Sequence, residues 1–171
     1  ARWLYDTPPA ACTRLLALQR CTGGPVADTA TAAVLGALAA PEVAKRSRRQ
    51  GVTVVNVGNS HVAAFLVFRG RILGVYEHHT GLLDTDALLF DLKEFGFGWL
   101  PDEQVRAKGG HGCAFLAPLP PEAEGFAPVF VVGPRRDMLQ GHGQFIAPHG
   151  DMMIAGCHGL LHGLALREES F

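Results

Sequence analysis

No stretch of this sequence is apolar for long enough to cross a membrane. Every apolar run falls short of the roughly 18 residues that a membrane-spanning helix requires, and the first residues do not resemble a signal peptide. The chain also lacks a surplus of either charge, because its net charge is −1 with histidine neutral. That balance favours neither nucleic acid nor an anionic membrane as a partner. We therefore expect a cytoplasmic protein with no nucleic-acid or membrane partner.

Cysteine is scarce, and its spacing suits neither a disulfide framework nor a metal cluster. The four cysteines are Cys12, Cys21, Cys113 and Cys157, and no two of them form a CxxC pair. This scatter is typical of reduced thiols in a cytosolic protein. No internal repeat stands out either. The chain does not begin with methionine, and we expect it to be a domain excised from a longer protein.

Apolar residues make up 48% of the 171 residues, which is enough for one domain with a well-buried core. The runs 52–57, 62–68 and 72–77 predict three consecutive strands. The two-residue link Arg69-Gly70 predicts a hairpin between the second and third strands. The first two runs are almost continuously apolar, which implies burial on both faces of the sheet. A further buried strand is expected at 128–132.

Helices are predicted before and after these strands. Apolar residues at helical spacing favour helices over 9–20 and 28–40, and the second of these has Asp28 or Thr29 as an N-cap candidate. Further helices are expected over about 85–95 and about 151–167. The basic run 45–50 is expected to be a solvated helix end and connector, with a phosphate-binding patch as the alternative. The order of elements predicts an α/β domain with a mixed sheet.

The loop between the first two strands consists of small polar residues that suit an anion. Gly58, Asn59 and Ser60 precede His61 at the start of the second strand. Such residues tolerate positive φ and allow successive backbone N–H groups to point into one concavity. That concavity is a nest suited to a phosphate. An ordinary hairpin turn is the alternative.

A second candidate segment follows the buried strand 128–132. It begins with Gly133 and continues through Pro134 to Arg135 and Arg136. Ligands of α/β sheets lie beyond the carboxyl ends of the strands. Glycine there allows a ligand to approach the backbone, and an arginine can form a paired contact with a phosphate or carboxylate. A strand-to-helix turn with solvated arginines is the alternative.

The third strand ends in polar residues. Glu77 and His79 share a face because neighbouring strand residues alternate, and such a pair can transfer protons or hold a metal. A plain polar strand end is the alternative. The glycine-rich segment with Gly110 and His111 has a similar composition and is expected to approach the same ligand. Antiparallel pairing should bring His61, which begins the second strand, close to the end of the third.

Two features of the last predicted helix concern packing more than chemistry. Ala155, Gly159 and Gly163 are spaced four apart and form a smooth face for close packing on a neighbour. His158 and His162 are also four apart and could share a metal. There is no HExxH motif, and ordinary solvated or satisfied histidines are favoured.

Several of these segments resemble the family labelled putative pyruvate formate-lyase activating enzyme. They are NVGNSH at 56–61, GGHG at 109–112, VVGPRR at 131–136 and PHGDMMIAGCHGLLHG at 148–163. The resemblance covers about residues 28–167. That family is placed in the actin-like ATPase superfamily, with sugar kinases, actin and heat-shock chaperones.

The resemblance implies a ribonuclease-H-like (actin-like ATPase) lobe. Its mixed sheet would open with an antiparallel three-stranded meander, with helices on the faces. The lobe would span 51–171, with a helical N-terminal segment, 1–50, packing on it. A first lobe would be absent from this chain. The resemblance supports nucleotide binding more firmly than ATP hydrolysis, because Asn56 stands where the superfamily's loop has an acid.

The family label itself implies radical chemistry, which needs a CxxxCxxC motif to hold an iron–sulfur cluster. The sequence has no such motif, and we expect no iron–sulfur cluster. The leading hypothesis is a lobe that binds a small phosphorylated ligand or nucleotide, such as ATP with Mg²⁺. Catalysis, if any, would be phosphoryl transfer or hydrolysis, with Glu77 or His79 positioning the nucleophile.

Two alternatives remain. The first is a metal-dependent hydrolase that uses His61, Glu77, His79 and His111 around Zn²⁺. The leading hypothesis, in contrast, assigns no metal ligands. The second is a non-enzymatic lobe that binds a partner or assembles into oligomers.

Overall fold

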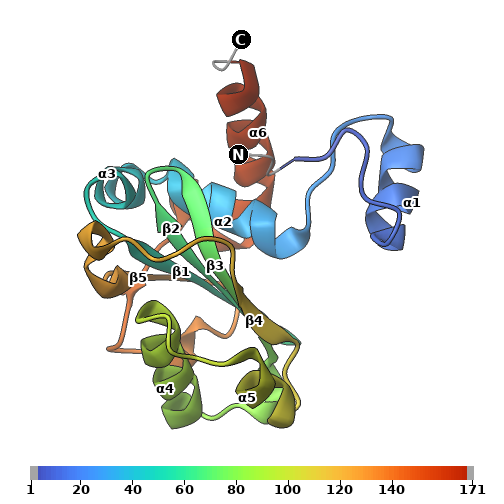
Figure 1. Ribbon diagram of the computed structural model, residues 1–171. Helices are drawn as coiled ribbons and strands as arrows, with labels where there is room; N and C mark the ends of the chain where they lie inside the picture. Colours follow the sequence, from blue (N-terminus) through green and yellow to red (C-terminus); the bar gives the residue numbers. More distant parts are fainter. Residues whose placement is uncertain (1–3, 169–171) are drawn as a thin grey trace.

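The computed structural model describes residues 4–168, which form a six-stranded mixed sheet with helices on both faces (Figure 1). The strands are β1 (Val52–Val57), β2 (His61–Phe68), β3 (Arg71–His79), β4 (Gly112–Phe115), β5 (Val129–Val132) and β6 (Gln144–Phe145). The helices are α1 (Thr13–Thr22), α2 (Thr29–Ala39), α3 (Pro41–Arg49), α4 (Thr85–Gly96), α5 (Asp102–Ala107) and α6 (Ala155–Glu168). None of the helices described is long and apolar enough to cross a bilayer.

The strand order is β4-β3-β2-β1-β5-β6. β1, β2 and β3 form the predicted antiparallel meander, β5 runs parallel to β1, and β6 runs parallel to β5. The link Arg69-Gly70 has φ of 49° and 73°, as a tight two-residue hairpin requires. An antiparallel meander continued by parallel strands is the ribonuclease-H-like arrangement. The structure therefore confirms the predicted fold class.

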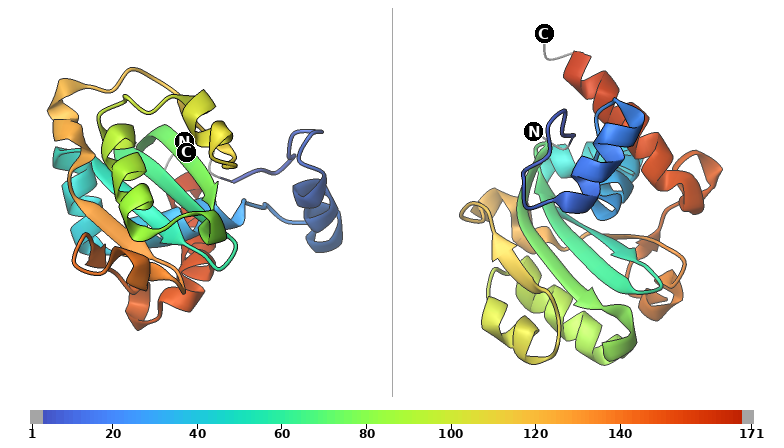
Figure 2. Two further views of the ribbon diagram at one scale, coloured as in Figure 1. Left: turned by 90° about the horizontal axis from the view of Figure 1, so that it is seen from below. Right: turned by 90° about the vertical axis from the view of Figure 1, so that its right-hand side faces the viewer.

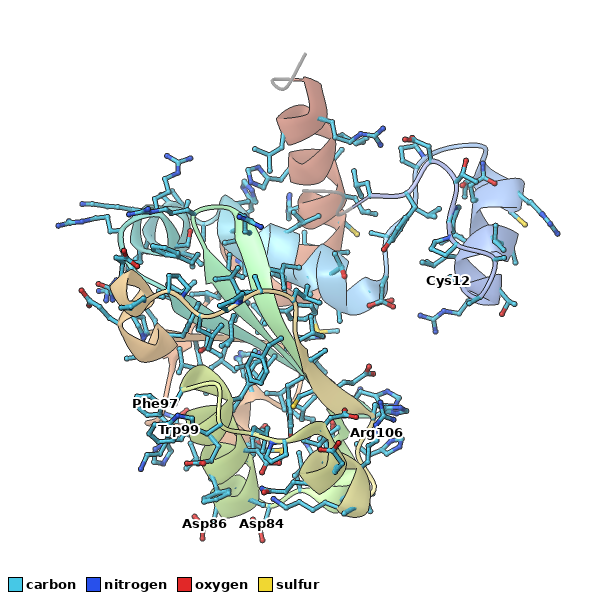
Figure 3. The ribbon with its side chains drawn as sticks, viewed as in Figure 1. Cys12, Asp84, Asp86, Phe97, Trp99 and Arg106 are labelled. Atoms are coloured by element: carbon cyan, nitrogen blue, oxygen red, sulfur yellow. The ribbon has the colours of Figure 1, made fainter. Side chains whose placement is uncertain are left out.

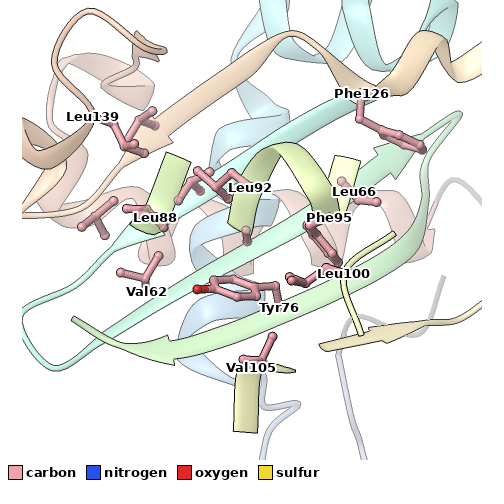
Figure 4. Close-up of a cluster of buried hydrophobic side chains, with 14 of the residues drawn as sticks. Val62, Leu66, Tyr76, Leu88, Leu92, Phe95, Leu100, Val105, Phe126 and Leu139 are labelled. Carbon is pink, nitrogen blue, oxygen red and sulfur yellow. The ribbon is translucent and has the colours of Figure 1, made fainter. Parts of the chain in front are cut away.

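Apolar clusters cover both faces of the sheet. On one face, Val62 and Tyr76 of the sheet lie in a cluster with Leu88, Leu92 and Phe95 of α4 (Figure 4). The second cluster combines β1, β2 and β5 residues with residues of α2 and α3. This two-sided burial explains why the first strands are apolar at nearly every position.

Helices α2 and α6 pack backbone to backbone. A Cβ atom added to Gly36 of α2 would overlap the carbonyl oxygen of Ala155, and one added to Gly159 would overlap that of Ala32. A Cβ on Gly163 would lie 3.1 Å from Leu35. The small-residue face predicted for the last helix is therefore confirmed, and its neighbour is α2.

The basic run 45–50 lies at the end of α3, as the expected helix end, but the sequence predicted no separate helix beginning at Pro41. Other elements differ from the sequence predictions. α5 and β6 were not predicted. α6 begins at Ala155 because a separate 3₁₀ turn, Met152–Ile154, takes Asp151 as its N-cap.

α1 stands apart from the body of the molecule (Figures 1 and 2).

Candidate functional site

The carboxyl ends of β1, β3 and β5 lie at one edge of the sheet. This follows from the pairing, because β5 is parallel to β1 while β2 runs antiparallel to both β1 and β3. The segments that follow these strands, together with the loop before β4, are called the polar edge below. They comprise Gly58–His61, Glu77–Thr80, Gly109–His111 and Gly133–Arg136.

The start of β2 lies beside the end of β3, as predicted. His61 and His79 are direct cross-strand partners, with their ring centroids 4.8 Å apart. Thr80, which the sequence analysis missed, ties the β1–β2 loop to β3. Its backbone N–H donates to Ser60 O at 2.9 Å, and its hydroxyl donates to Gly58 O at 2.8 Å.

The β1–β2 loop does not have the left-handed backbone expected of a nest. Positive φ occurs at none of residues 57–61. The Gly58 N–H already donates to His61 O at 2.9 Å, so it is not available to an anion. Glycine is needed here for a different reason, because a Cβ at this position would lie 2.8 Å from the His61 carbonyl oxygen. Asn59 and Ser60 are exposed at the tip of the loop.

The segment after β5 is joined to the end of β1. Gly133 has a φ of 105°, and a Cβ there would overlap Val57 O and lie 2.8 Å from Asn56 Oδ1. The Arg135 N–H donates to the same Val57 carbonyl at 3.0 Å. The segment after β5 therefore packs against the last residue of β1, directly before the loop that begins at Gly58.

The two arginines of this segment differ in the contacts and exposure of their side chains. The Arg136 guanidinium lies over the Phe145 ring, 5.6 Å from its centroid, and contacts Gly133 O at 3.5 Å. Arg135 is exposed. Arg135 is therefore the better candidate for contact with an anionic ligand.

Three histidines from three parts of the chain converge at the polar edge. His61 starts β2, His79 ends β3, and His111 lies in the loop before β4. The His111 ring centroid is 4.5 Å from that of His79 and 5.0 Å from that of His61. One ligand nitrogen from each ring lies within 4.8 Å of the others. These three residues are called the histidine cluster below.

The electrostatics of the cluster favour a neutral ring at His79. Partial burial, followed by the proximity of His111 and His61, holds the pKa of His79 below its ordinary value. Glu77 acts in the opposite direction but is a smaller influence. At neutral pH His79 therefore has a free ring nitrogen that can accept a hydrogen bond or bind a metal.

The position of His111 depends on a glycine. The His111 N–H donates to Glu77 O at 3.0 Å, and the Gly110 N–H donates to Val105 O at 2.9 Å. A Cβ at Gly110 would overlap the His78 ring and lie 2.7 Å from Val105. The loop therefore passes directly over the buried His78 and places the His111 ring beside His79.

His78 is fully buried, unlike its neighbour His79. Its Nδ1 lies 3.2 Å from His79 O, and its Nε2 has no hydrogen-bond partner among the residues described. The strand alternation predicted this separation of the two side chains.

Glu77 is half-buried in a shallow depression that also contains Asp102, Arg106 and His111. Asp102 accepts hydrogen bonds from Arg106 at 2.7 Å and from the Cys113 N–H at 2.9 Å. These bonds lower the pKa of Asp102, with the larger effect from Arg106. Figure 3 shows Arg106 on α5, at the end of the sheet where β4 begins. This ion pair was also missed in the sequence, where α5 was not predicted.

The chain was compared with known families and structures. Residues 1–138 match the model of the family described as "Putative pyruvate format-lyase activating enzyme (DUF1786)". Among solved structures, the chain is similar to MreB5 of Spiroplasma citri bound to ADP, with 11% identity and a TM-score of 0.46. That match covers 90% of this chain and 65% of the other, so the chain spans less than two thirds of that structure's length. None of the curated proteins compared with the chain matches it.

Proposed function

We propose that this chain, which belongs to the family described as "Putative pyruvate format-lyase activating enzyme" (DUF1786), is a lobe that binds phosphate or a nucleotide on its polar edge. The description of the family suggests radical chemistry instead. The sequence does not support that activity, because it contains no CxxxCxxC motif to hold an iron–sulfur cluster. The observation that carries the proposal is the junction between the two loops, where Gly133 packs on Val57 O and the Arg135 N–H bonds to it.

This junction supports the proposal because it holds Arg135 next to the carboxyl end of β1. In α/β sheets, ligands lie beyond the carboxyl ends of the strands, and here the ends of β1 and β5 are adjacent. Arg135 is exposed, and its N–H bonds to Val57, the last residue of β1 before the loop in which Asn59 and Ser60 are exposed. A guanidinium group with neighbouring polar groups suits a phosphate better than an uncharged ligand.

The proposed site is primarily a site for ligand binding. ATP with Mg²⁺ is the ligand we favour, and phosphoryl transfer or hydrolysis would need a group to position the nucleophile. Glu77 and His79 are the candidates for that role, since both lie at the end of β3. Asn56 is a weaker ligand for Mg²⁺ than a carboxylate, so binding without rapid turnover is the expected behaviour.

A second lobe, N-terminal to this one in the full protein, would close the ligand between two surfaces. α6 supports this part of the proposal because it has large apolar side chains on the surface. Leu161 is 65% exposed and Leu164 is 38% exposed, and exposed apolar patches are typical of interaction surfaces. The single lobe is therefore expected to bind more weakly than the full protein.

The test is calorimetric titration of the chain with inorganic phosphate and with ADP plus Mg²⁺. Arg135→Ala should weaken binding by roughly tenfold to a hundredfold, the usual range for a hydrogen bond to a charged group. Arg71→Ala is the matched control, because Arg71 is an exposed arginine at the opposite end of the sheet. Equal affinity in the parent and both variants would remove Arg135 from the site and contradict the proposal.

A further inference from the structure

We propose that His61, His79 and His111 form a binding site for a single divalent transition-metal ion, of which Zn²⁺ is the best fit. The three ligand nitrogens lie within 4.8 Å of one another and come from β2, β3 and the loop before β4. This inference does not depend on the nucleotide proposal, which is carried by Arg135, although both proposals give His79 a role.

The backbone fixes all three histidines in place. His61 and His79 are opposite each other in an antiparallel pair, so their Cβ atoms are held about 4.5–5.5 Å apart. The bonds from Thr80 to Ser60 O and Gly58 O hold this end of the hairpin together. His111 is held against β3 by its own N–H bond to Glu77 O. Convergence of the rings is thus a property of the sheet and its loops.

The separation of the nitrogens is close to what an ion requires. With Zn–N bonds of about 2.0–2.1 Å in a tetrahedral site, ligand nitrogens lie about 3.4 Å apart. The three nitrogens lie within 4.8 Å of one another, which exceeds that spacing by about 1.4 Å. We expect rotation of the imidazole rings about their side-chain torsions to close this difference.

The donor set selects the class of metal. Imidazole nitrogen suits Zn²⁺, Cu²⁺, Ni²⁺ and Fe²⁺, whereas Mg²⁺ and Ca²⁺ prefer oxygen ligands. Three protein ligands leave one tetrahedral position open for water or a ligand oxygen, as in zinc sites that act chemically. His111 reaches solvent, so an ion and a fourth ligand can enter from outside.

The site also has a consequence for Glu77 and His79. A metal-bound imidazole cannot exchange a proton through the coordinated nitrogen, which would remove His79 from the proton-transfer role suggested by the sequence. Glu77, which lines the neighbouring depression with His111, would then be the carboxylate closest to a metal-bound water along β3. A water on Zn²⁺ is a strong nucleophile at neutral pH.

The experiment is a Zn²⁺ titration of the 171-residue chain, purified without a polyhistidine tag and stripped of metal with a chelator. Calorimetry should show one equivalent bound. His79→Ala and His111→Ala should each weaken the affinity at least about a hundredfold, the upper end for loss of a group that supports a metal ligand. His142→Ala is the control, because His142 is exposed and lies outside the cluster.

Co²⁺ supplies an independent readout of geometry. In the parent chain it should give the intense visible absorption of a tetrahedral site, and His111→Ala should abolish that absorption. Thermal unfolding without metal should be nearly the same in the parent and His111→Ala, which separates loss of a ligand from loss of the fold. Binding that survives the His79 and His111 substitutions would overturn the proposal. The rings of His149 and His158 also lie close together, with their centroids 4.1 Å apart, so this pair is the competing site. Loss of binding in His158→Ala, instead of in the cluster variants, would overturn the proposal. Failure of the parent chain to bind Zn²⁺ would overturn it as well.

Discussion

The contact between α2 and α6 can be tested by adding a single methyl group. In the structure, a Cβ at Gly159 would overlap Ala32 O and lie 2.6 Å from Gly36 N. Both obstacles are backbone atoms, so the helices must separate to make room. Overpacking of this kind costs typically about 1–3 kcal/mol, and we expect Gly159→Ala to reach the upper end. The gain in helix propensity from glycine to alanine, about 1 kcal/mol, opposes this cost, so the net destabilisation should be about 2 kcal/mol.

Gly156, one turn earlier in α6, provides the matched control. A Cβ there would meet its nearest neighbour, Ala32 Cβ, at 3.7 Å, which is ordinary van der Waals contact. Gly156→Ala should therefore stabilise the protein by about 0.5–1 kcal/mol. Urea unfolding followed by circular dichroism at 222 nm measures both variants. If the two have the same free energy of unfolding, the close approach of α6 to α2 does not exist in solution.

Two further predictions concern the interior of the protein. Lys108→Met should destabilise the protein by about 2 kcal/mol, because the buried Asp91 carboxylate loses its 2.8 Å ion pair and keeps the hydrogen bond from the Tyr76 hydroxyl. This figure is below the usual 3–5 kcal/mol for a buried pair because Lys108 is 39% exposed. A double-mutant cycle with Asp91→Asn should recover most of the loss, and additive effects would argue against the pair. Cys113 should resist iodoacetamide at pH 8 while the exposed Cys157 reacts, because burial and nearby carboxylates raise the pKa of Cys113 to about 11. Equal alkylation rates, measured by peptide mass spectrometry, would contradict that prediction.

The sequence predicted the centre of the fold well because strong patterns determine it. The three apolar runs of the meander and the Arg69-Gly70 turn have few alternative arrangements. The four-residue spacing of Ala155, Gly159 and Gly163 identified a packing face, although the partner helix could only be found in the structure.

Short elements escaped prediction because their stability comes from tertiary contacts. α5 has six residues and depends on the burial of Val105, and β6 has two residues paired to β5. Neither length gives a recognisable periodicity. α3 was not predicted as a helix of its own because most of its residues after Val43 are basic.

The arrangement of the candidate residues was predicted in part. Polar residues at the strand ends predicted that these segments share one edge of the sheet, and the proximity of His61 to His79 followed from antiparallel pairing. The nest at the β1–β2 loop was wrong in its backbone geometry, because glycine at position 58 is required by the His61 carbonyl and not by a positive φ. Composition cannot distinguish these two reasons for a glycine.

The most direct test of the central claim is an amide chemical-shift map of the ¹⁵N-labelled chain titrated with inorganic phosphate and with ADP plus Mg²⁺. The account predicts that the largest shifts occur together at Asn59, Ser60, Arg135 and Arg136, and that they saturate with one dissociation constant. Shifts that fall elsewhere on the lobe, or no shifts at millimolar ligand, would contradict the claim that the polar edge binds a phosphorylated ligand.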